Sequence, residues 1–510
     1  MIDYPVRAHR SEEQLARNDE LAWRIAEVAH DRVEVDDDVV DMVINRVIDD
    51  AAVAVAALSR RSVAAARDQA VRHPYRAGAT VLGLDAAVRV SPEWAAWANG
   101  VAVRELDFHD TFLGAEYAHP GDSIPPIVAV AQHAGRSNGR AIAGGDVVRA
   151  IATAYETQID LSRAISLHAH HIDHVAHLGP SVAAGLGTLL ELEPEVIYHA
   201  IGQALHTTTQ TRQSRKGVIS TWKAYAPAFT GKAAVEAVDR AMRGQTSPTP
   251  IYEGEDGIIA RLLDGPEARY VVSLPDTGES KRAMLDSFTK EHAAEYQAQA
   301  WIDLARDLHD RYPELRDGSR VDEIVLYTSQ HTHVVIGSGS NDPQKYDPAA
   351  TRETLDHSVA YIVAVALQDG AWHHERSYTH ARANRPDTVA LWRRIRTVED
   401  PAWTSRYHAT DPRQRAFGGR IEIRLRDGSR IVDEIAAADA HPNGRRPFTR
   451  PAYVAKFRRL AEGVLENAEI ERFLEVAARL PELTSAELAG LTVRASRKVL
   501  ESVAPTRGVF

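Results

Sequence analysis

Residues 36–58, DDDVVDMVINRVIDDAAVAVAAL, decide how the first half of the chain is interpreted. Apolar residues in this stretch recur at steps of three and four, as on the buried face of an amphipathic α-helix. They are Val39, Met42, Val43, Val47 and Ile48. The acidic residues 36–38 stand where carboxylates favour a helix N-terminus. We therefore predict a helix from Val39 onward.

The helical pattern recurs up to about residue 270, for example in 142–165 and 231–243. Beyond about residue 275, segment 319–329 alternates apolar and polar residues, as a strand does. Segment 420–435 holds two such runs joined by Asp427-Gly428, which predicts a hairpin because both residues tolerate positive φ. From residue 451 the helical pattern returns. The sequence thus predicts a mainly α protein with a mixed insertion and a helical tail that packs back on the first half.

The composition is that of an ordinary globular protein, because 44% of the 510 residues are hydrophobic and 26% are charged. There is no cysteine, which excludes disulfides, thiolate zinc sites, a cysteine nucleophile and cysteine-held clusters. The net charge of −11 disfavours nucleic acid and anionic membranes as partners. The start lacks the apolar core of a secretory signal, and the apolar stretches 51–58 and 360–367 are too short to span a bilayer. We expect a cytoplasmic protein.

Histidines are concentrated in HAHHIDHVAH, residues 168–177. Imidazoles at such spacing can bind zinc or another divalent metal. On one helix His170, His174 and His177 would share a face, while His168 and His171 would point elsewhere. Solvated or hydrogen-bonded histidines give the same pattern. We favour the interpretation without a metal.

Two further segments concentrate groups that can do chemistry. Residues 103–126 place Asp107, His109, Asp110, Thr111 and His119 around an irregular Gly/Pro stretch, which suits either a functional loop or turns and a helix cap. Residues 206–234 supply cations for carboxylate or phosphate groups beside many hydroxyls: Arg212, Arg215, Lys216 and Lys223. GKAA (231–234) is not a phosphate loop, and no strand-linked G-x-G-x-x-G is present. Nucleotide cofactors have no support.

Together these segments resemble the MmgE/PrpD family over nearly the whole chain. The resemblance rests on LDFHDT with a following His-Pro (106–120), IDHVAHLGPSVAAGLGTLLEL (172–192), TWKAYAPAFTGKAAVEAV (221–238) and LDHSVAYIVAVALQDG (355–370). The Gly/Arg-rich segment DAHPNGRRPF (439–448) adds to it.

The resemblance implies a homodimeric enzyme with a large all-helical domain and a smaller α+β lid. We assign residues 1–275 to the helical domain, completed by 440–510, and 276–439 to the lid. The implied activity is removal of water from 2-methylcitrate, in propionate catabolism, without a cofactor or iron–sulfur cluster. Decarboxylation of cis-aconitate, another tricarboxylate reaction in the same pocket, and a binding protein without turnover stay as alternatives.

The resemblance also implies the site residues. Asp107 and Thr111 match the acidic motif, and His119 matches the histidine before proline. His174 is the better match for the next active-site histidine, with His177 as competitor. The remaining matches and candidate substrate contacts are Lys223, Lys290, Arg212 and Arg446, with Tyr296-Gln297 standing where the family usually has a histidine.

Dehydration needs a base for a weakly acidic C–H bond, an acid for the leaving hydroxyl and cations for the carboxylates. We expect His119 and His174 to form the acid/base pair, in an order that the sequence leaves open. Asp107 would orient one imidazole, and Lys223, helped by Arg212 or Arg446, would bind carboxylate. Lys223 is expected to matter for turnover and little for stability. A limb of the pH profile is expected near the histidine pKa of ~6.5, shifted by the pocket.

Overall fold

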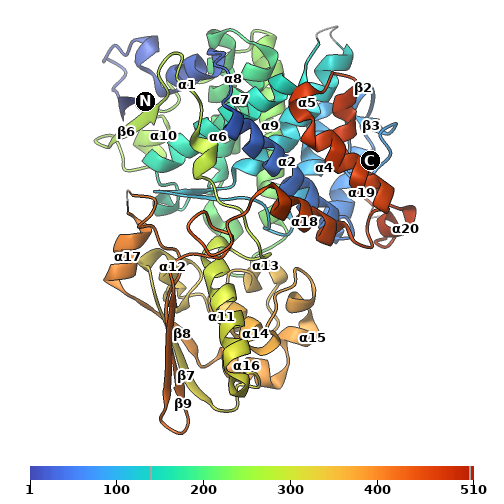
Figure 1. The fold of residues 1–510 in the computed structure, drawn as a ribbon. Coiled ribbons are helices and arrows are strands. Elements are labelled where there is room, and N and C mark those ends of the chain that lie inside the picture. The colour runs from blue at the N-terminus through green and yellow to red at the C-terminus, as the bar shows by residue number, and fades with distance from the viewer. Residues whose placement is uncertain (138–140, 410, 505–506, 510) are drawn as a thin grey trace.

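Most helices of the chain form an upper body, which contains both termini (Figure 1). The computed structural model describes residues 1–137, 141–409, 411–504 and 507–509. Before the insertion this body has α1 (Leu21–His30), α2 (Asp37–Ala57), α3 (Arg61–Ala70), α4 (Pro92–Arg104), α5 (Ile124–Ser137), α6 (Gly144–Ala164), α7 (Val175–Leu190), α8 (Pro194–Thr208), α9 (Trp222–Met242) and α10 (Ile258–Leu262). Two-stranded pairs join β1 (Ile2–Arg7) to β6 (Arg269–Leu274), β2 (Pro74–Thr80) to β3 (Arg89–Val90), and β4 (Phe112–Leu113) to β5 (Tyr117–Ala118). The mainly α prediction is confirmed.

Helix α2 is the helix predicted for residues 36–58. Over most of its length it is buried on all sides, whereas an amphipathic pattern predicts burial of one face. Every residue from Val43 to Leu58 is buried. The buried set includes Arg46, Asp49 and Asp50, so this helix carries charge into the interior. Buried charges need partners, because an isolated one is costly in a medium of low polarity. Those partners come from the C-terminal tail and from the loop after α4.

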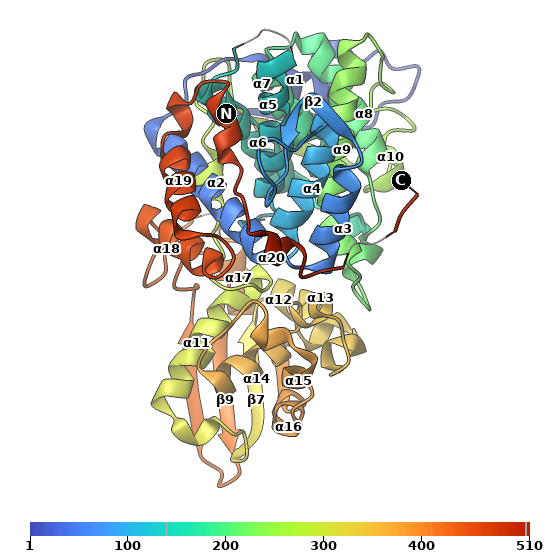
Figure 2. The same cartoon turned by 90° about the vertical axis from the view of Figure 1, so that its right-hand side faces the viewer.

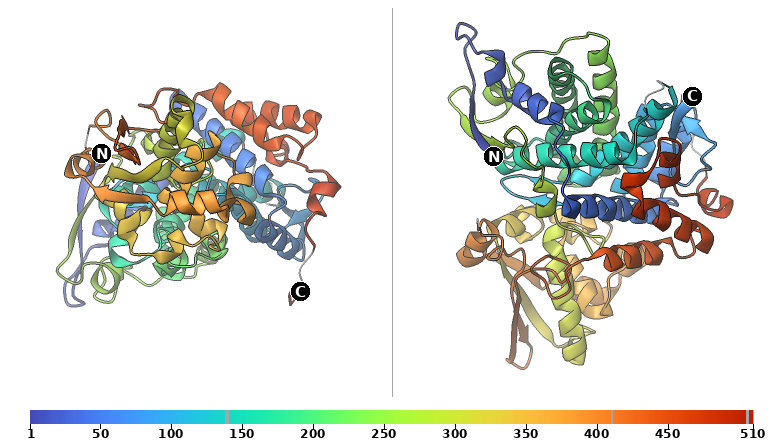
Figure 3. Two further views of the ribbon diagram at one scale, coloured as in Figure 1. Left: turned by 90° about the horizontal axis from the view of Figure 1, so that it is seen from below. Right: turned by 45° about the horizontal axis from the view of Figure 1, so that its top comes forward.

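The C-terminal helices lie beside α2, as the right-hand view of Figure 3 shows. They are α18 (Arg450–Ala461), α19 (Asn467–Ala478) and α20 (Arg497–Leu500). The buried Lys456 of α18 donates to Asp49 of α2 at 2.7 Å and to the carbonyl oxygen of Phe108 at 2.8 Å. The tail therefore supplies one of the cations that neutralise the carboxylates of α2.

Residues from about 299 to 435 form a lower body with its own apolar core (Figure 2). Its helices are α11 (Gln299–Arg311), α12 (Gln330–Val335), α13 (Arg352–Leu355), α14 (Val359–Asp369), α15 (His380–Ala383), α16 (Pro386–Trp392) and α17 (Pro401–Tyr407). Its sheet has the order β10 (Arg430–Ile435), β9 (Gly419–Leu425), β7 (Val321–Thr328), β8 (Ile395–Glu399). Only β7 and β8 are parallel. In β9 the buried Ile421, Ile423 and Leu425 alternate with more exposed charged residues, so one face of the sheet packs on the core.

Three local predictions can be compared with these elements. The hairpin between β9 and β10 is confirmed, but its turn is longer than the two residues Asp427-Gly428, and of these two only Gly428 has positive φ. Segment 142–165 forms α6. The helix expected at 231–243 begins nine residues earlier, at Trp222, and continues through Pro227.

The chain passes between the two bodies twice, at about residues 275–299 and 436–449 (Figure 1). At the second crossing Arg446 pairs with Asp439 at 3.1 Å and with Glu291 of the first crossing at 3.3 Å. The exact domain limits stay a prediction. Within the described ranges, none of the helices is both long and apolar enough to cross a membrane.

Candidate active site

A small closed cavity lies where the two bodies meet. The upper body contributes Arg104, Asp107, Thr111, Tyr117, His119, Arg212 and Arg215, the lower body contributes Val335 and His357, and Glu295 comes from the first crossing between the bodies. The cavity volume is about 20 Å³, room for about one water molecule. A larger ligand can reach these side chains only if parts of the two bodies move apart.

Asp107 is the centre of the ionic contacts at this cavity. It follows the end of α4 with a φ of 49°, a left-handed conformation that aspartate tolerates better than most residues. Its Oδ1 accepts from Lys290 Nζ at 2.8 Å, and its Oδ2 lies 3.1 Å from Lys223 Nζ. Arg104 Nη1 is 3.6 Å from Oδ1. Burial opposes ionisation, but Lys223, Lys290 and Arg104 outweigh it and hold the pKa of Asp107 well below its usual range.

Lys223, in the first turn of α9, joins Asp107 to a second buried carboxylate. Its Nζ donates to both oxygens of Asp356 at 2.8 Å and lies 3.4 Å from His357 Nδ1. The oxygens of Asp107 and Asp356 and a ring nitrogen of His357 are close enough to one another to hold a metal ion. The ammonium group of Lys223 already contacts all three residues, so it supplies the positive charge there. Lys223 is only 4% exposed and pairs with two buried carboxylates, so the structure favours a contribution to stability over the small effect expected from the sequence.

His119 is held as one defined tautomer. Its Nδ1 lies 2.8 Å from the carbonyl oxygen of Asp110, which can only accept, so Nδ1 carries the proton. The other nitrogen, Nε2, therefore has a free lone pair, 4.0 Å from Asp107 Oδ1. Burial, together with the cations Arg104 and Lys290, holds the pKa of His119 well below its usual range. At neutral pH this imidazole is an uncharged base.

His174 stands next to His119, directly before α7. The centroids of their rings are 5.3 Å apart, and Tyr117 packs against His174 at 5.4 Å. Among the described residues neither ring nitrogen of His174 has a hydrogen-bond partner. Burial lowers the pKa of His174 to about 3, with Asp173 opposing the shift and Arg215 adding to it. A buried imidazole with both nitrogens unpartnered is available to a substrate.

Arginine side chains form the wall beyond the imidazoles. Arg215 is buried and pairs with Asp173 at 3.1 Å. Arg212 donates to the Tyr117 hydroxyl at 2.7 Å and contacts His168. Thr111 also lines the cavity, although its hydroxyl already donates to the carbonyl oxygen of Ala118 at 3.0 Å. These guanidinium groups can bind carboxylate groups.

Three of the residues expected to bind substrate do not line the cavity. Arg446 is at the second crossing, paired with Glu291 and Asp439. Tyr296 packs among aromatic rings, 5.5 Å from Phe288. Gln297 does not line the cavity and donates to the hydroxyl of Tyr407 at 3.3 Å.

The histidine run does not form a common face. Residues His168–His170 form a 3₁₀ turn, His171 has a φ of 57°, and α7 begins only at Val175. His177 bonds to the carbonyl oxygen of Ile165 at 3.0 Å, and His170 lies 3.5 Å from Asp264. The helical geometry assumed for His170, His174 and His177 is therefore wrong, and the structure directs these side chains to different partners.

Several cavity residues were not selected from the sequence: Arg104, Tyr117, Glu295, Asp356 and His357. Asp356 and His357 belong to LDHS (355–358), inside one of the segments that carry the resemblance, so a signal for them was present. Glu295 directly precedes the Tyr296-Gln297 pair that was selected, so the selection missed the cavity residue by one position. Arg104 and Tyr117 have no signal of their own.

The arrangement defines a class of site: neutral imidazoles next to an ionised aspartate, with lysines and arginines around them. Such a site can move protons on a small molecule that carries several carboxylates. Two family models match the sequence and identify the family to which the chain belongs. The MmgE/PrpD N-terminal domain matches residues 19–271 and the MmgE/PrpD C-terminal domain matches residues 292–482. The chain belongs to the MmgE/PrpD family.

Curated relatives show what this chain is similar to. The mitochondrial 2-methylcitrate dehydratase of Yarrowia lipolytica is 28% identical over 413 residues, which covers 78% of this chain and 75% of the relative. The 2-methylcitrate dehydratase of Escherichia coli K12 is 27% identical over 431 residues, covering 79% and 83%. That of Cupriavidus necator is 28% identical over 392 residues, covering 72% and 75%.

Proposed function

We propose that the protein is a 2-methylcitrate dehydratase, which eliminates water to give 2-methyl-cis-aconitate. The observation that carries the proposal is the pair His119 and His174, 5.3 Å apart between ring centroids, enclosed by lysines and arginines. The names of the relatives agree with this substrate. Tricarboxylate binding requires several cations in a small space. Arg104, Arg212 and Arg215 line the cavity, and Lys223 and Lys290 pair with Asp107 in its wall.

His119 acts as the base in this proposal. Its Nε2 lone pair is fixed by the bond from Nδ1 to the Asp110 carbonyl oxygen. It takes the proton from the carbon next to a carboxylate, and the resulting imidazolium is stabilised by Asp107 at 4.0 Å. The electron pair of the broken C–H bond forms the double bond as the hydroxyl leaves.

His174 acts as the acid and protonates the departing hydroxyl, so that water leaves. Without a ligand its pKa is about 3, because burial, Arg215 and Arg104 lower it by more than Asp173 and Asp122 raise it. A bound trianion adds negative charge beside this ring and raises the pKa, which favours the protonated form. Return of a proton from His119 to His174 then restores the starting state.

The carboxylates are bound by Lys223, Lys290, Arg104, Arg212 and Arg215. Charge that builds up on the carboxylate next to the broken C–H bond is stabilised by these fixed cations. Substrate access requires Glu295 of the first crossing and Val335 and His357 of the lower body to move away from the upper-body wall.

The direct test is purified protein with 2-methylcitrate, citrate and cis-aconitate. We expect enoate absorbance and 2-methyl-cis-aconitate, identified by NMR, to appear fastest from 2-methylcitrate. Release of CO₂ from cis-aconitate with no dehydration of 2-methylcitrate would replace this function by decarboxylation. Binding without any turnover would make the protein a metabolite-binding protein.

We also propose that the enzyme is a homodimer built on the helical body. One face of α9 exposes large aromatic groups seven residues apart: Trp222 is 42% exposed and Phe229 38%. Burying such a face is the usual result of association. Sedimentation at micromolar concentration that shows only a species of 56.1 kDa would rule the dimer out.

A further inference from the structure

Glu295 is the one cavity residue whose charge the proposed dehydration does not use. It precedes a 3₁₀ turn (Tyr296–Ala298), and its Oε2 accepts from the backbone N–H of Gln297 at 2.7 Å. Its own N–H donates to the carbonyl oxygen of Asp356 at 3.1 Å. Because Asp356 is the partner of Lys223, the backbone of Glu295 is fixed to the ionic core of the site.

The side chain of Glu295 faces the cavity. It is half-buried, whereas Tyr296 and Gln297, the next two residues, are fully buried. Its exposed part is a portion of the cavity wall. Only one of its two oxygens, Oε2, has a hydrogen-bond donor among the described residues.

Glu295 differs from Asp107, the other carboxylate of the wall. Asp107 has three cationic nitrogens within 4.0 Å, from Lys223, Lys290 and Arg104. Within the described part of the chain Glu295 forms no ion pair at that distance. Asp107 is thus neutralised before a substrate binds, and Glu295 is not.

We infer that Glu295 is a specificity-determining residue: its carboxyl group must be protonated before a substrate with several carboxylates can bind. This inference rests on the proposed function for its substrate class. The neutral carboxyl can donate a hydrogen bond to a substrate carboxylate or hydroxyl. The ionised form repels a trianion and weakens binding by about tenfold or more.

The groups around Glu295 keep its proton near neutral pH. Charged or titratable groups that act on it come from four places: Lys290 and Tyr296 on its own segment, Asp107 after α4, Lys345 before α13 and Tyr407 at the end of α17. Burial raises the pKa of Glu295 to about 7, against the attraction of Lys290 and with help from Asp107. The side chain is therefore neutral below about pH 7 and ionised above it.

The histidines of the site do not titrate in the same range. The pKa values of His119 and His174 are both lowered, so both imidazoles stay uncharged as Glu295 loses its proton. Glu116, behind Tyr117, has a pKa raised by burial to about 7 and is the competing carboxyl group. Its Oε2 accepts from the backbone of His168 and it does not line the cavity. Experiments must separate these two acids.

The first experiment measures kcat and KM for 2-methylcitrate from about pH 6 to about pH 9. In the native enzyme we expect kcat/KM to fall about tenfold more per pH unit above the pKa of Glu295 than below it, through KM rather than kcat. This added fall should be absent in Glu295→Gln, which cannot ionise, whereas any fall due to proton uptake by His174 stays. Glu295→Asp should keep the added fall.

Two variants serve as controls. Glu116→Gln should keep the added fall, because Glu116 is outside the wall. Glu253→Gln removes a remote buried carboxyl whose pKa is also about 7, and it should keep both the activity and the added fall. Loss of the added fall in Glu116→Gln, or its persistence in Glu295→Gln, would overturn the inference.

A second measurement needs no turnover. Calorimetry with tricarballylate, a tricarboxylate without the hydroxyl group, in two buffers of different ionisation enthalpy gives the protons taken up on binding. At about pH 8 we expect the native protein to take up about one proton per site more than Glu295→Gln, because uptake by His174 is common to both, and equal uptake refutes the role of Glu295. Failure of the proposed function is distinct, since native protein would then bind tricarballylate but form no product from 2-methylcitrate.

Discussion

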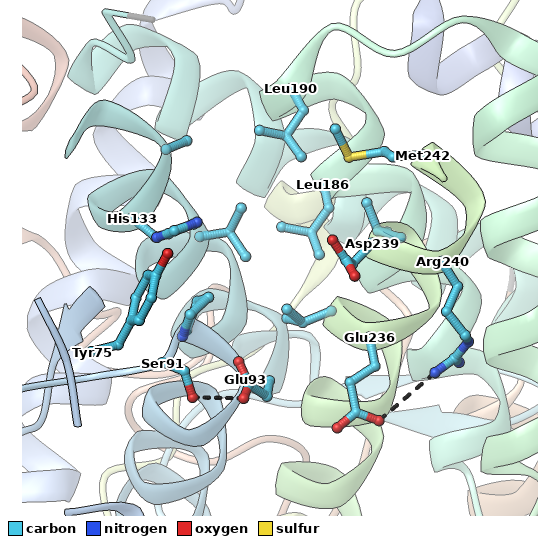
Figure 4. Close-up of a pocket in the computed structure, with 15 residues that line it drawn as sticks. Tyr75, Ser91, Glu93, His133, Leu186, Leu190, Glu236, Asp239, Arg240 and Met242 are labelled. Atoms are coloured by element: carbon cyan, nitrogen blue, oxygen red, sulfur yellow. Dashed lines mark hydrogen bonds and ion pairs between the residues drawn. The ribbon is translucent and has the colours of Figure 1, made fainter. Parts of the chain in front are cut away.

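Two hollows of this molecule differ in size and in chemistry. The cavity between the bodies measures about 20 Å³ and is lined by ionisable side chains. A groove in the upper body, shown in Figure 4, measures about 460 Å³ and has an apolar floor that includes Leu186, Leu190 and Val235. Large apolar pockets are the usual first hypothesis for a binding site. Here the smaller hollow is the better candidate.

The difference lies in whether polar groups converge. The polar groups on the rim of the groove are partnered locally: Ser91 donates to Glu93 at 2.6 Å, and Arg240 lies 3.9 Å from Glu236 (Figure 4). At the cavity, His119 has one free lone pair, and His174 directly behind it has two ring nitrogens without a hydrogen-bond partner among the described residues. Unused hydrogen-bonding capacity next to fixed charge, rather than volume, distinguishes a reactive site.

The largest expected effect comes from His174→Gln. Loss of the proton donor should lower kcat by about 10²–10⁴-fold, because glutamine cannot deliver a proton. Single-turnover kinetics with 2-methylcitrate measure it.

His177→Gln is the matched control. His177 lies three residues further along and is bonded to the Ile165 carbonyl oxygen, away from the cavity wall. It should lower thermal stability and keep kcat. Equal losses in the two variants would contradict the assignment of His174.

Lys223→Ala should lower kcat by about 10²-fold or more. It also leaves Asp107 and Asp356 with one cation fewer in a buried site, which costs about 3–5 kcal/mol in the free energy of unfolding. Urea denaturation and initial rates measure the two effects separately.

Lys232→Ala, on the same helix, tests the side of the molecule where the groove lies. Lys232 pairs with Glu236 and lies over the ring of Trp94 at 4.7 Å. Its removal should change the activity little. A fall in kcat like that of Lys223→Ala would mean that α9 as a whole, not the cavity, controls turnover.

Part of the fold and part of the candidate site could be predicted from the sequence. The helical pattern of 36–58 predicted α2, and the resemblance selected Asp107, His119, His174, Lys223 and Lys290, which the structure gathers around one cavity. Their roles stay predictions. Helix periodicity is a local property of the sequence, so a helix can be predicted from it without knowledge of the tertiary fold.

The errors arise where contacts between residues far apart in the sequence determine which side chains reach the site. Asp356 and His357 meet Lys223 across more than 130 residues, which no local pattern reveals. One residue of register separates Glu295, in the cavity wall, from Tyr296, which packs on Phe288. Arg446 carried the right charge, but the crossing of the chain directs it to Glu291 and Asp439.

The pH profile of the native enzyme gives a smaller effect, a displacement of its acid limb. The pKa values of His119 and His174 are lowered, so His119 stays neutral and able to accept a proton until the pH falls well under ~6.5. We expect no loss of kcat/KM as the pH drops through that value. Circular dichroism at each pH should verify that the fold persists. A limb at the ordinary histidine pKa would show that the imidazoles are solvated.

Treatment with a strong chelator should have no effect on the rate. The ammonium group of Lys223 contacts Asp107, Asp356 and His357, so a cation is already present where these groups meet. His119 and His174 must exchange protons, which a coordinated imidazole cannot do. Activity that disappears with chelation and returns with zinc or iron(II) would overturn the acid/base assignment.

The smallest effect is expected at the groove, from Asp239→Asn. Asp239 is part of the groove rim and pairs with Arg243 at 2.9 Å, with side chains 61% and 70% exposed. An exposed pair four residues apart on a helix contributes about 0.3–0.5 kcal/mol, so its loss should barely alter the melting temperature. No group of the cavity wall contacts it, so kcat and KM for 2-methylcitrate should both remain at native values. A change in KM alone would show that the groove affects substrate binding at the cavity. The groove could then no longer be treated as separate from the site.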